Sequence, residues 1–250
     1  MFRGSRKHVL DWTARPEFVS EMIALVSAIP VKITAGAKWM PRCLEEPDEA
    51  RLETFGPDWI PSHHAWGNLK DWWLIHKQGA NTPNWDIAVG CIIEDRPGLV
   101  LVEAKANWQE LKVDGKVLRK NASKKSQENH QQIGKAIAEA NSGWQRIDPR
   151  VAITRDSHYQ LANRLAYTWK LGMLGFPVVL VYLGFTQDEG IRDVGDPFID
   201  SQDWNQAFSN YADSIVPLEL FGRRIDLGPA PVWLVLRSRP VLEVSPQAAS

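Results

Sequence analysis

Ionisable residues lie inside two otherwise apolar segments of this 250-residue chain. Asp86 stands near the start of segment 85–94, and Glu103 and Lys105 stand near the end of segment 98–106. An unpaired charge is costly to bury, so these side chains need partners or a ligand. Residues two apart in a strand point to the same face. If the second segment is a strand, Glu103 and Lys105 therefore share one side of a sheet.

The two segments are rich in β-branched residues, and Asp95-Arg96-Pro97-Gly98 between them predicts a hairpin turn. A turn centred near residues 95–96 places Asp86 opposite residues 104–106, so two carboxylates and an ammonium meet at one end of the hairpin. Two carboxylates this close repel each other unless a cation lies between them. Mg²⁺ accepts one or two carboxylates and keeps several waters, so Mg²⁺ or Mn²⁺ is the expected cofactor, with the backbone carbonyl of Ala104 as a further ligand. The alternative is a salt bridge at the strand end between Lys105 and one of the acids.

This arrangement of residues resembles the PD-(D/E)XK nuclease superfamily, whose fold is called restriction-endonuclease-like. The resemblance is carried by Pro83-Asn84-Trp85-Asp86 and, one hairpin later, by Glu103-Ala104-Lys105. It implies that Asp86 and Glu103 bind the metal and that Lys105 assists water activation. The implied function is a metal-dependent nuclease, with endonuclease action on DNA as the first expectation. Pro83 stands three residues before Asp86 rather than directly before it, which is a departure at a variable position of the motif.

The resemblance also implies a core of helix, three strands, helix and strand, with a mixed central sheet flanked by helices. Apolar periodicity supplies candidates for each element: a helix at 16–29, strands at 72–77, 85–93 and 99–105, a helix at 158–174 and a strand at 178–185. Further helices are predicted at 47–55, 126–141 and 201–213, with strands at 232–238 and 241–244. We therefore expect one α/β domain over residues 1–250. Its nuclease-like core would take in 16–29 and 70–190, followed by a C-terminal decoration over 191–250.

Two of the predicted helices carry additional candidates. Many superfamily members have a polar pair on the helix that follows the Glu-x-Lys strand, and Gln160 and Arg164 lie one turn apart on the helix 158–174. Asn163 and Tyr167 share this polar side, which could contact phosphates or base edges. A solvated helix face is the alternative. On the first helix, the resemblance implies an extra acidic ligand, for which Glu21 is the candidate and Glu17 the second choice.

The polar stretch 105–125 contains seven basic residues and two acidic ones. Its position directly after the Glu-x-Lys strand predicts a loop that follows a phosphate backbone. A mobile solvated loop is the alternative. The basic candidates beyond Lys105 are Lys112, Lys116, Arg119, Lys120, Lys124 and Lys125.

Composition narrows the classes of function. The net charge of −1 argues against a protein that holds nucleic acid by bulk charge alone, although a local basic patch fits. Two cysteines cannot form a disulfide framework, and no apolar run is long enough to cross a membrane, so a cytoplasmic protein without a membrane partner is expected. Nucleic acid, with DNA first, is the expected partner, and the oligomeric state stays open, a homodimer included.

Two other functions remain as rivals. The first is a catalytically silent module with the same fold that binds nucleic acid or protein. The second is a carbohydrate-active enzyme, suggested by twelve tryptophans and the paired carboxylates. A lysine two residues from the glutamate has no evident role in that chemistry, so the second rival ranks low.

Overall fold

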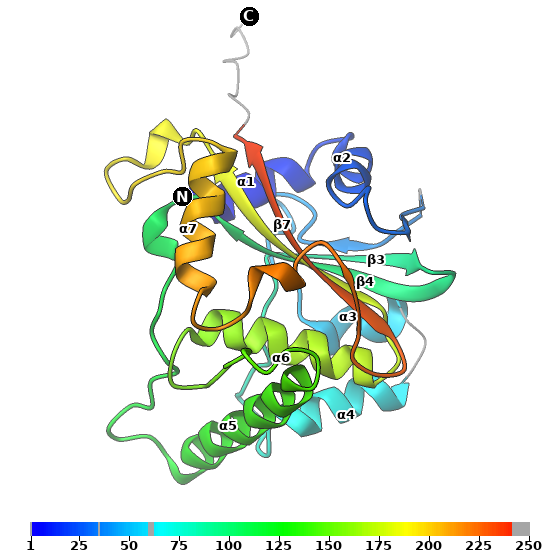
Figure 1. Cartoon of the computed structure of the whole chain (residues 1–250), viewed down its shortest axis with the longest axis vertical. Helices are drawn as coiled ribbons and strands as arrows, with labels where there is room; N and C mark the ends of the chain where they lie inside the picture. Colours follow the sequence, from blue (N-terminus) through cyan, green and yellow to red (C-terminus); the bar gives the residue numbers. More distant parts are fainter. Residues whose placement is uncertain (1, 35, 60–62, 242–250) are drawn as a thin grey trace, which may run out of the picture.

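A curled, mixed sheet with helices on both faces forms the centre of the computed structural model, which describes residues 2–34, 36–59 and 63–241 (Figure 1). Seven strands have the order β1-β3-β4-β5-β7-β6, and β2 also pairs with β3. The strands are β1 (Val31–Lys32), β2 (Trp39–Met40), β3 (Ile87–Ile93), β4 (Arg96–Lys105), β5 (Val178–Thr186), β6 (Arg224–Asp226) and β7 (Pro231–Pro240). The prediction of an α/β protein with a mixed sheet flanked by helices is confirmed.

Helices cover the two faces of the sheet unequally. Helices α4, α5 and α6 are stacked on one side, and α1 and α2 lie on the other (Figure 1). The helices are α1 (Gly4–Thr13), α2 (Phe18–Leu25), α3 (Leu52–Trp59), α4 (His63–Trp73), α5 (Lys124–Gln145), α6 (Tyr159–Met173) and α7 (Ser201–Ala212). Alternate strand residues enter separate apolar layers, as the period of two in a strand requires: Leu99 and Leu101 face the α4–α6 side, while Val100 and Val102 face α1 and α2.

The hairpin of β3 and β4 has a tighter turn than the sequence suggested. Ile93 pairs with Arg96, so Glu94 and Asp95 alone form the turn, both with positive φ (48° and 60°). Two-residue hairpin turns of this kind match the twist of the flanking strands. The predicted turn over residues 95–98 was therefore placed too late, and the ladder, which pairs Ile87 with Val102, brings Asp86 beside Glu103 rather than opposite residues 104–106.

Two crossovers extend the sheet with parallel strands. The chain passes from β4 through α5 and α6 to β5, and from β5 through α7 and the short strand β6 to β7; the pairs β4–β5 and β5–β7 are parallel. Strand β5 is buried along its whole length, as a continuous apolar strand covered on both faces should be. Strand β7 is part of the central sheet, and it spans 231–240 instead of the predicted 232–238. The other predicted strand, 241–244, lies outside the described residues after Val241, which is not in a strand.

One predicted strand is wrong. Residues 72–77 do not form a strand: α4 continues to Trp73, and the chain then becomes irregular. Leu69, Trp72 and Trp73 are buried in the layer with α5 and α6, and their spacing fits a helical face better than a strand. Helix α1 was not predicted, α2 is shorter than 16–29, and α3 begins at Leu52 instead of residue 47.

Candidate active site

The three charged residues of the proposed motif meet at one cavity of about 650 Å³, which we call the Asp86 cavity. Its wall includes Asp86 at the start of the hairpin, and Glu103 and Lys105 at the end of β4. The first turns of α6 contribute the polar candidates of that helix, namely Gln160, Asn163 and Arg164.

The hairpin register determines why these side chains converge. Directly opposed residues of an antiparallel pair point to the same face, and so do residues two apart in one strand. Asp86, Glu103 and Lys105 therefore all point to the face that carries α6. The backbone supports the arrangement, because the Ala104 amide donates a hydrogen bond of 2.8 Å to Oδ2 of Asp86.

Both oxygens of the Glu103 carboxylate receive a hydrogen bond from a cation. Lys105 Nζ donates to Oε1 at 2.6 Å, and Arg164 Nε donates to Oε2 at 2.6 Å. The Glu103 side chain is 2% exposed, so these ion pairs are almost fully shielded from water. Lys105 Nζ also donates to Oε1 of Gln160 at 3.1 Å, which links the end of β4 to the first turn of α6. The predicted salt bridge at the strand end thus exists, as part of a larger network.

Burial and charge separate the two carboxyl groups. Burial, reinforced by the negative charge of Glu103, raises the pKa of Asp86 to about 7. Burial alone would also raise the pKa of Glu103, but the positive charges of Arg164 and Lys105 outweigh this effect and lower the pKa of Glu103 to about 2. Although burial opposes it, the nearby carboxylates Glu103 and Asp86 hold the pKa of Lys105 above its usual value. Near neutral pH the site therefore contains a fixed ion network around Glu103 and one acid, Asp86, that titrates.

The polar residues of α6 divide into those that reach the cavity and one that does not. Arg164 stacks over the Trp85 ring at 4.5 Å and also donates a hydrogen bond of 2.8 Å to the Asn163 side chain. These two contacts fix the orientation of its guanidinium group. Tyr167, by contrast, is fully buried among Trp72, Trp73 and Trp85. The expectation that Tyr167 contacts nucleic acid is corrected: α6 is covered on more sides than a single apolar stripe suggested.

Glu21 also lies elsewhere. It stands on α2, where its carboxylate accepts a hydrogen bond from Trp12 Nε1 at 2.6 Å and pairs with Arg15 and Arg239. Neither Glu21 nor Glu17 lines the Asp86 cavity. The structure thus does not place the expected extra metal ligand at the site.

The basic stretch reaches the site only in part. Lys112 and Lys116 line the Asp86 cavity, and Lys116 Nζ stands over the Tyr159 ring at 4.6 Å. Two backbone hydrogen bonds hold this loop against the start of α6. The Lys116 amide donates to the Arg155 carbonyl, and the His158 amide donates to the Val113 carbonyl. The other predicted contacts with nucleic acid, Arg119, Lys120, Lys124 and Lys125, are exposed and do not line the cavity.

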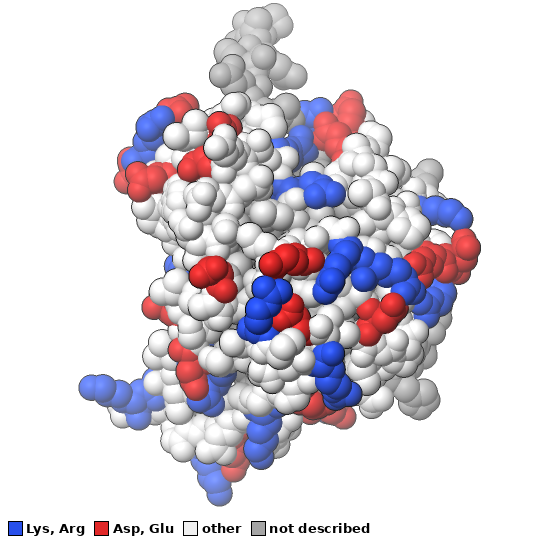
Figure 2. Space-filling view, in the orientation of Figure 1, with Lys and Arg blue, Asp and Glu red and all other residues white. Residues whose placement is uncertain are grey.

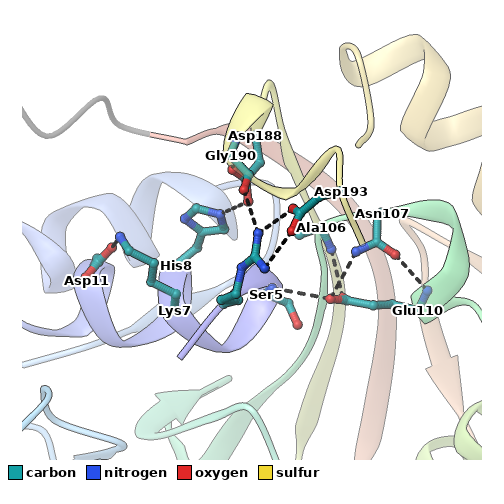
Figure 3. A network of polar contacts seen from close by, with 11 residues as sticks. Ser5, Lys7, His8, Asp11, Ala106, Asn107, Glu110, Asp188, Gly190 and Asp193 are labelled. Atoms are coloured by element: carbon teal, nitrogen blue, oxygen red, sulfur yellow. Dashed lines mark hydrogen bonds and ion pairs between the residues drawn. The ribbon is translucent and has the colours of Figure 1, made fainter. Parts of the chain in front are cut away.

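Sequence reasoning missed the contribution of α1. Ser5 and Arg6 line the cavity from this helix, and Glu110, just after β4, connects it to the strand end. The Glu110 carboxylate accepts hydrogen bonds from the Ala106 amide at 2.9 Å and the Ser5 amide at 3.4 Å (Figure 3). On the same helix, His8 pairs with Asp188 (Figure 3). The acid at 110 was visible in the sequence, but nothing there indicated that the N-terminal segment would pack beside it.

The acids of the cavity suit a magnesium ion in number and type. No group of three or more His, Cys, Asp or Glu side chains arranged to hold a metal is found in the described part of the chain. Asp86 and Glu103 are nevertheless two adjacent carboxylates at an open cavity, and Mg²⁺ needs only one or two, with waters completing its shell. The raised pKa of Asp86 reflects its burial first and the charge of Glu103 second, and a divalent cation beside Asp86 would favour its ionised form. Since Glu103 already binds two cations, it would have to share an oxygen with the metal.

Comparisons with protein-family models, with curated proteins and with solved structures each returned no match. Among the described residues, no helix combines the length and apolar character that crossing a membrane requires.

Proposed function

We propose that this protein is a metal-dependent nuclease that hydrolyses phosphodiester bonds, with DNA as its first expected substrate and endonucleolytic cleavage as its mode. The observation that carries the proposal is the meeting of Asp86, Glu103 and Lys105 in one cavity that also receives Gln160 and Arg164. A purely structural ion pair has no need of a second acid that burial makes costly to ionise.

The fold supports the proposal at a coarser level. In chain order, α2 is followed by the short strands β1 and β2, then, after α3 and α4, by β3 and β4, and, after α5, by α6 and β5. With α3, α4 and α5 taken as additions, this order is compatible with the helix, strands, helix and strand of a restriction-endonuclease-like core, in which β1 and β2 would replace the strand wrongly predicted at 72–77. The antiparallel hairpin β3–β4 followed by parallel β5 provides the strand end on which the three site residues lie.

Each residue of the network has a role in the proposed mechanism. Hydrolysis forms a bond between a water oxygen and phosphorus and breaks one ester bond, which yields a phosphate monoester and an alcohol. Asp86 and Glu103 would hold Mg²⁺, which supplies polarisation of the phosphate and a more acidic bound water. Lys105 donates to Glu103 and Gln160 in the resting protein, so its ammonium is held where it can orient the water or a phosphate oxygen. Arg164 keeps Glu103 ionised and in place.

The direct test combines metal titration with cleavage. Calorimetric titration of Mg²⁺ or Mn²⁺ into wild type and Asp86→Asn should show metal binding that the variant loses. Incubation with plasmid should show metal-dependent nicking that falls by about 100-fold or more in Asp86→Asn and Lys105→Ala. Asp213→Asn, an exposed acid outside the cavity, is the matched control and should cleave as wild type does. Equal nicking by well-folded Lys105→Ala and wild type would refute the assignment.

The existing ion pairs of Glu103 favour one other function. Because both carboxylate oxygens already accept from Lys105 and Arg164, the same cavity could serve a catalytically silent module that binds nucleic acid. In that case the titration would show no metal binding by wild type, and an oligonucleotide would bind equally well with and without a chelator.

A further inference from the structure

A second pocket, which we call the Arg119 pocket, adjoins the Asp86 cavity. It has a volume of about 450 Å³ and lies between the end of α4, the loop before α5 and the first turns of α5. Asn81 and Lys116 line both hollows, so the two share part of their wall. A ligand chain that occupies one is thereby next to the other.

The lining of the Arg119 pocket combines an apolar floor with polar groups at its edge. Leu74 and Ile133 are almost fully buried beneath it, while Asn81, Asn121 and Ser126 are exposed around it. The His130 ring forms another part of the lining, held by a hydrogen bond of 2.8 Å from Nε2 to the Lys116 carbonyl. Amides and a hydroxyl around an apolar floor suit a flat ring with hydrogen-bonding edges, as in a nucleobase.

The charge around this pocket is complementary to a polyanion. Residues 112–125 carry six basic side chains and only one acid, Asp114. Within the described residues, no ion pair is found for Arg119, Lys120 or Lys125, so these cations are available to a ligand. Lys and Arg side chains project at the lower left in Figure 2, the part of the molecule where Figure 1 draws the loop before α5.

We propose that the Arg119 pocket receives an unstacked base of a single-stranded nucleic acid whose neighbouring phosphate lies in the Asp86 cavity. The inference rests on the proposed function for the phosphate, and it adds the substrate class: single strands or unpaired segments in preference to duplex. Bases in a duplex are stacked and paired and cannot enter a pocket without first being extruded, which costs a few kcal/mol. An unpaired strand avoids this cost and can place its backbone along the basic loop.

Fluorescence anisotropy in metal-free buffer, with a labelled oligodeoxythymidine of about 20 nucleotides, tests the pocket without cleavage. Ser126→Trp should fill the pocket and weaken binding about tenfold, through the loss of one base's contacts, with an unchanged salt dependence. Arg119→Glu should weaken binding and lower the slope of log affinity against log salt by about one or more. Lys135→Glu, further along α5 and outside both hollows, is the charge-matched control and should bind nearly as wild type does.

The outcomes separate this inference from the proposed nuclease activity. Weaker binding by Ser126→Trp and Arg119→Glu, with tighter binding of wild type to the single strand than to the same sequence as duplex, supports the pocket, even if no substrate is cleaved. Wild-type cleavage of plasmid together with unchanged oligonucleotide binding by both variants overturns the pocket and leaves the nuclease proposal intact. If Lys135→Glu weakened oligonucleotide binding as much as Arg119→Glu does, the binding would reflect general charge attraction. This result would also overturn the pocket.

Discussion

The two faces of the central sheet each contain a carboxylate bound by two cations, and the two clusters differ in what surrounds them. On the side of α1 and α2, Glu21 pairs with Arg15 and Arg239 at 3.1 Å each and accepts from Trp12. On the side of α6, Glu103 pairs with Lys105 and Arg164 at 2.6 Å each. Each cluster has a second acid. Glu17, 57% exposed, pairs with Arg15 of the first cluster, whereas Asp86 of the second stands beside Glu103 at the wall of an open cavity.

This difference distinguishes a structural ion cluster from one suited to a ligand. At Glu21 two arginines meet two acids, because Arg15 also pairs with Glu17, but the Glu21 side chain is 30% exposed, so water shares in its solvation. At Glu103 two acids and two cations are packed together, and burial, with the charge of Glu103, makes Asp86 costly to ionise. A cluster that holds one acid in an unfavourable state can gain energy by binding a cation, whereas a satisfied cluster cannot. Stability and pH measurements can test this contrast.

The largest expected effect is that of Glu103→Gln on stability. The substitution leaves Lys105 and Arg164 buried without their shared carboxylate, and loss of one partner of a buried ion pair costs about 3–5 kcal/mol. Urea denaturation should show this decrease in the free energy of unfolding. Glu219→Gln, whose side chain is 67% exposed beside Arg150, is the control and should change it by less than about 1 kcal/mol. A similarly small change at Glu103 would mean that Asp86 replaces it as the partner of the cations.

The next effect is a pH dependence that belongs to Asp86. Its folded-state pKa, about 7, lies above the ordinary value of 3.8, so the folded protein holds this proton more tightly than the unfolded chain does. The stabilisation from protonation is complete below about pH 4 and is lost as the pH rises through 7. With metal removed by a chelator, wild type should therefore lose a few kcal/mol relative to Asp86→Asn over this interval. Parallel stability curves of the two proteins from pH 4 to 8 would contradict the raised pKa.

The smallest effect is expected at the other face. Glu21→Gln keeps the side chain's shape and its hydrogen bond from Trp12 but removes a partly exposed charge, so the free energy of unfolding should fall by about 1 kcal/mol or less. Nicking of plasmid should be unchanged, because Glu21 does not line the Asp86 cavity. A loss of cleavage without a loss of stability would make Glu21 part of the site and remove the contrast between the two clusters.

Much of the site could be predicted because its signal is local. The hairpin, the charges within apolar strands and the helix with Gln160 and Arg164 are all read from a few consecutive residues. The ladder and the ion pairs place Asp86, Glu103 and Lys105 together as the spacing predicted, although the turn was displaced. The nuclease activity, the metal and the nucleic-acid partner stay predictions.

The features that sequence reasoning missed depend on packing between distant segments. Helix α1 contributes Ser5 and Arg6 to the cavity through contacts with the chain near Glu110, about a hundred residues away. Tyr167 shows the converse, since its place opposite the apolar stripe of the helix suggested an outward position, while aromatic rings, Trp73 and Trp85 among them, contact its fully buried ring. The short strands β1 and β2 have two residues each, too few for a periodic pattern to reveal.

The turn at Glu94 and Asp95 has a consequence for how this site can vary. It lies at the far end of the hairpin from Asp86, yet its length decides which residue faces Asp86 across the ladder. One inserted residue that entered the ladder, instead of lengthening the loop, would shift the register and turn Glu103 and Lys105 toward the apolar layer of Val100 and Val102, because side chains alternate along a strand. Residues that tolerate positive φ can be exchanged at the turn without this shift. The spacing of the charged groups is thus stored as a count of residues in a loop that itself takes no part in the chemistry.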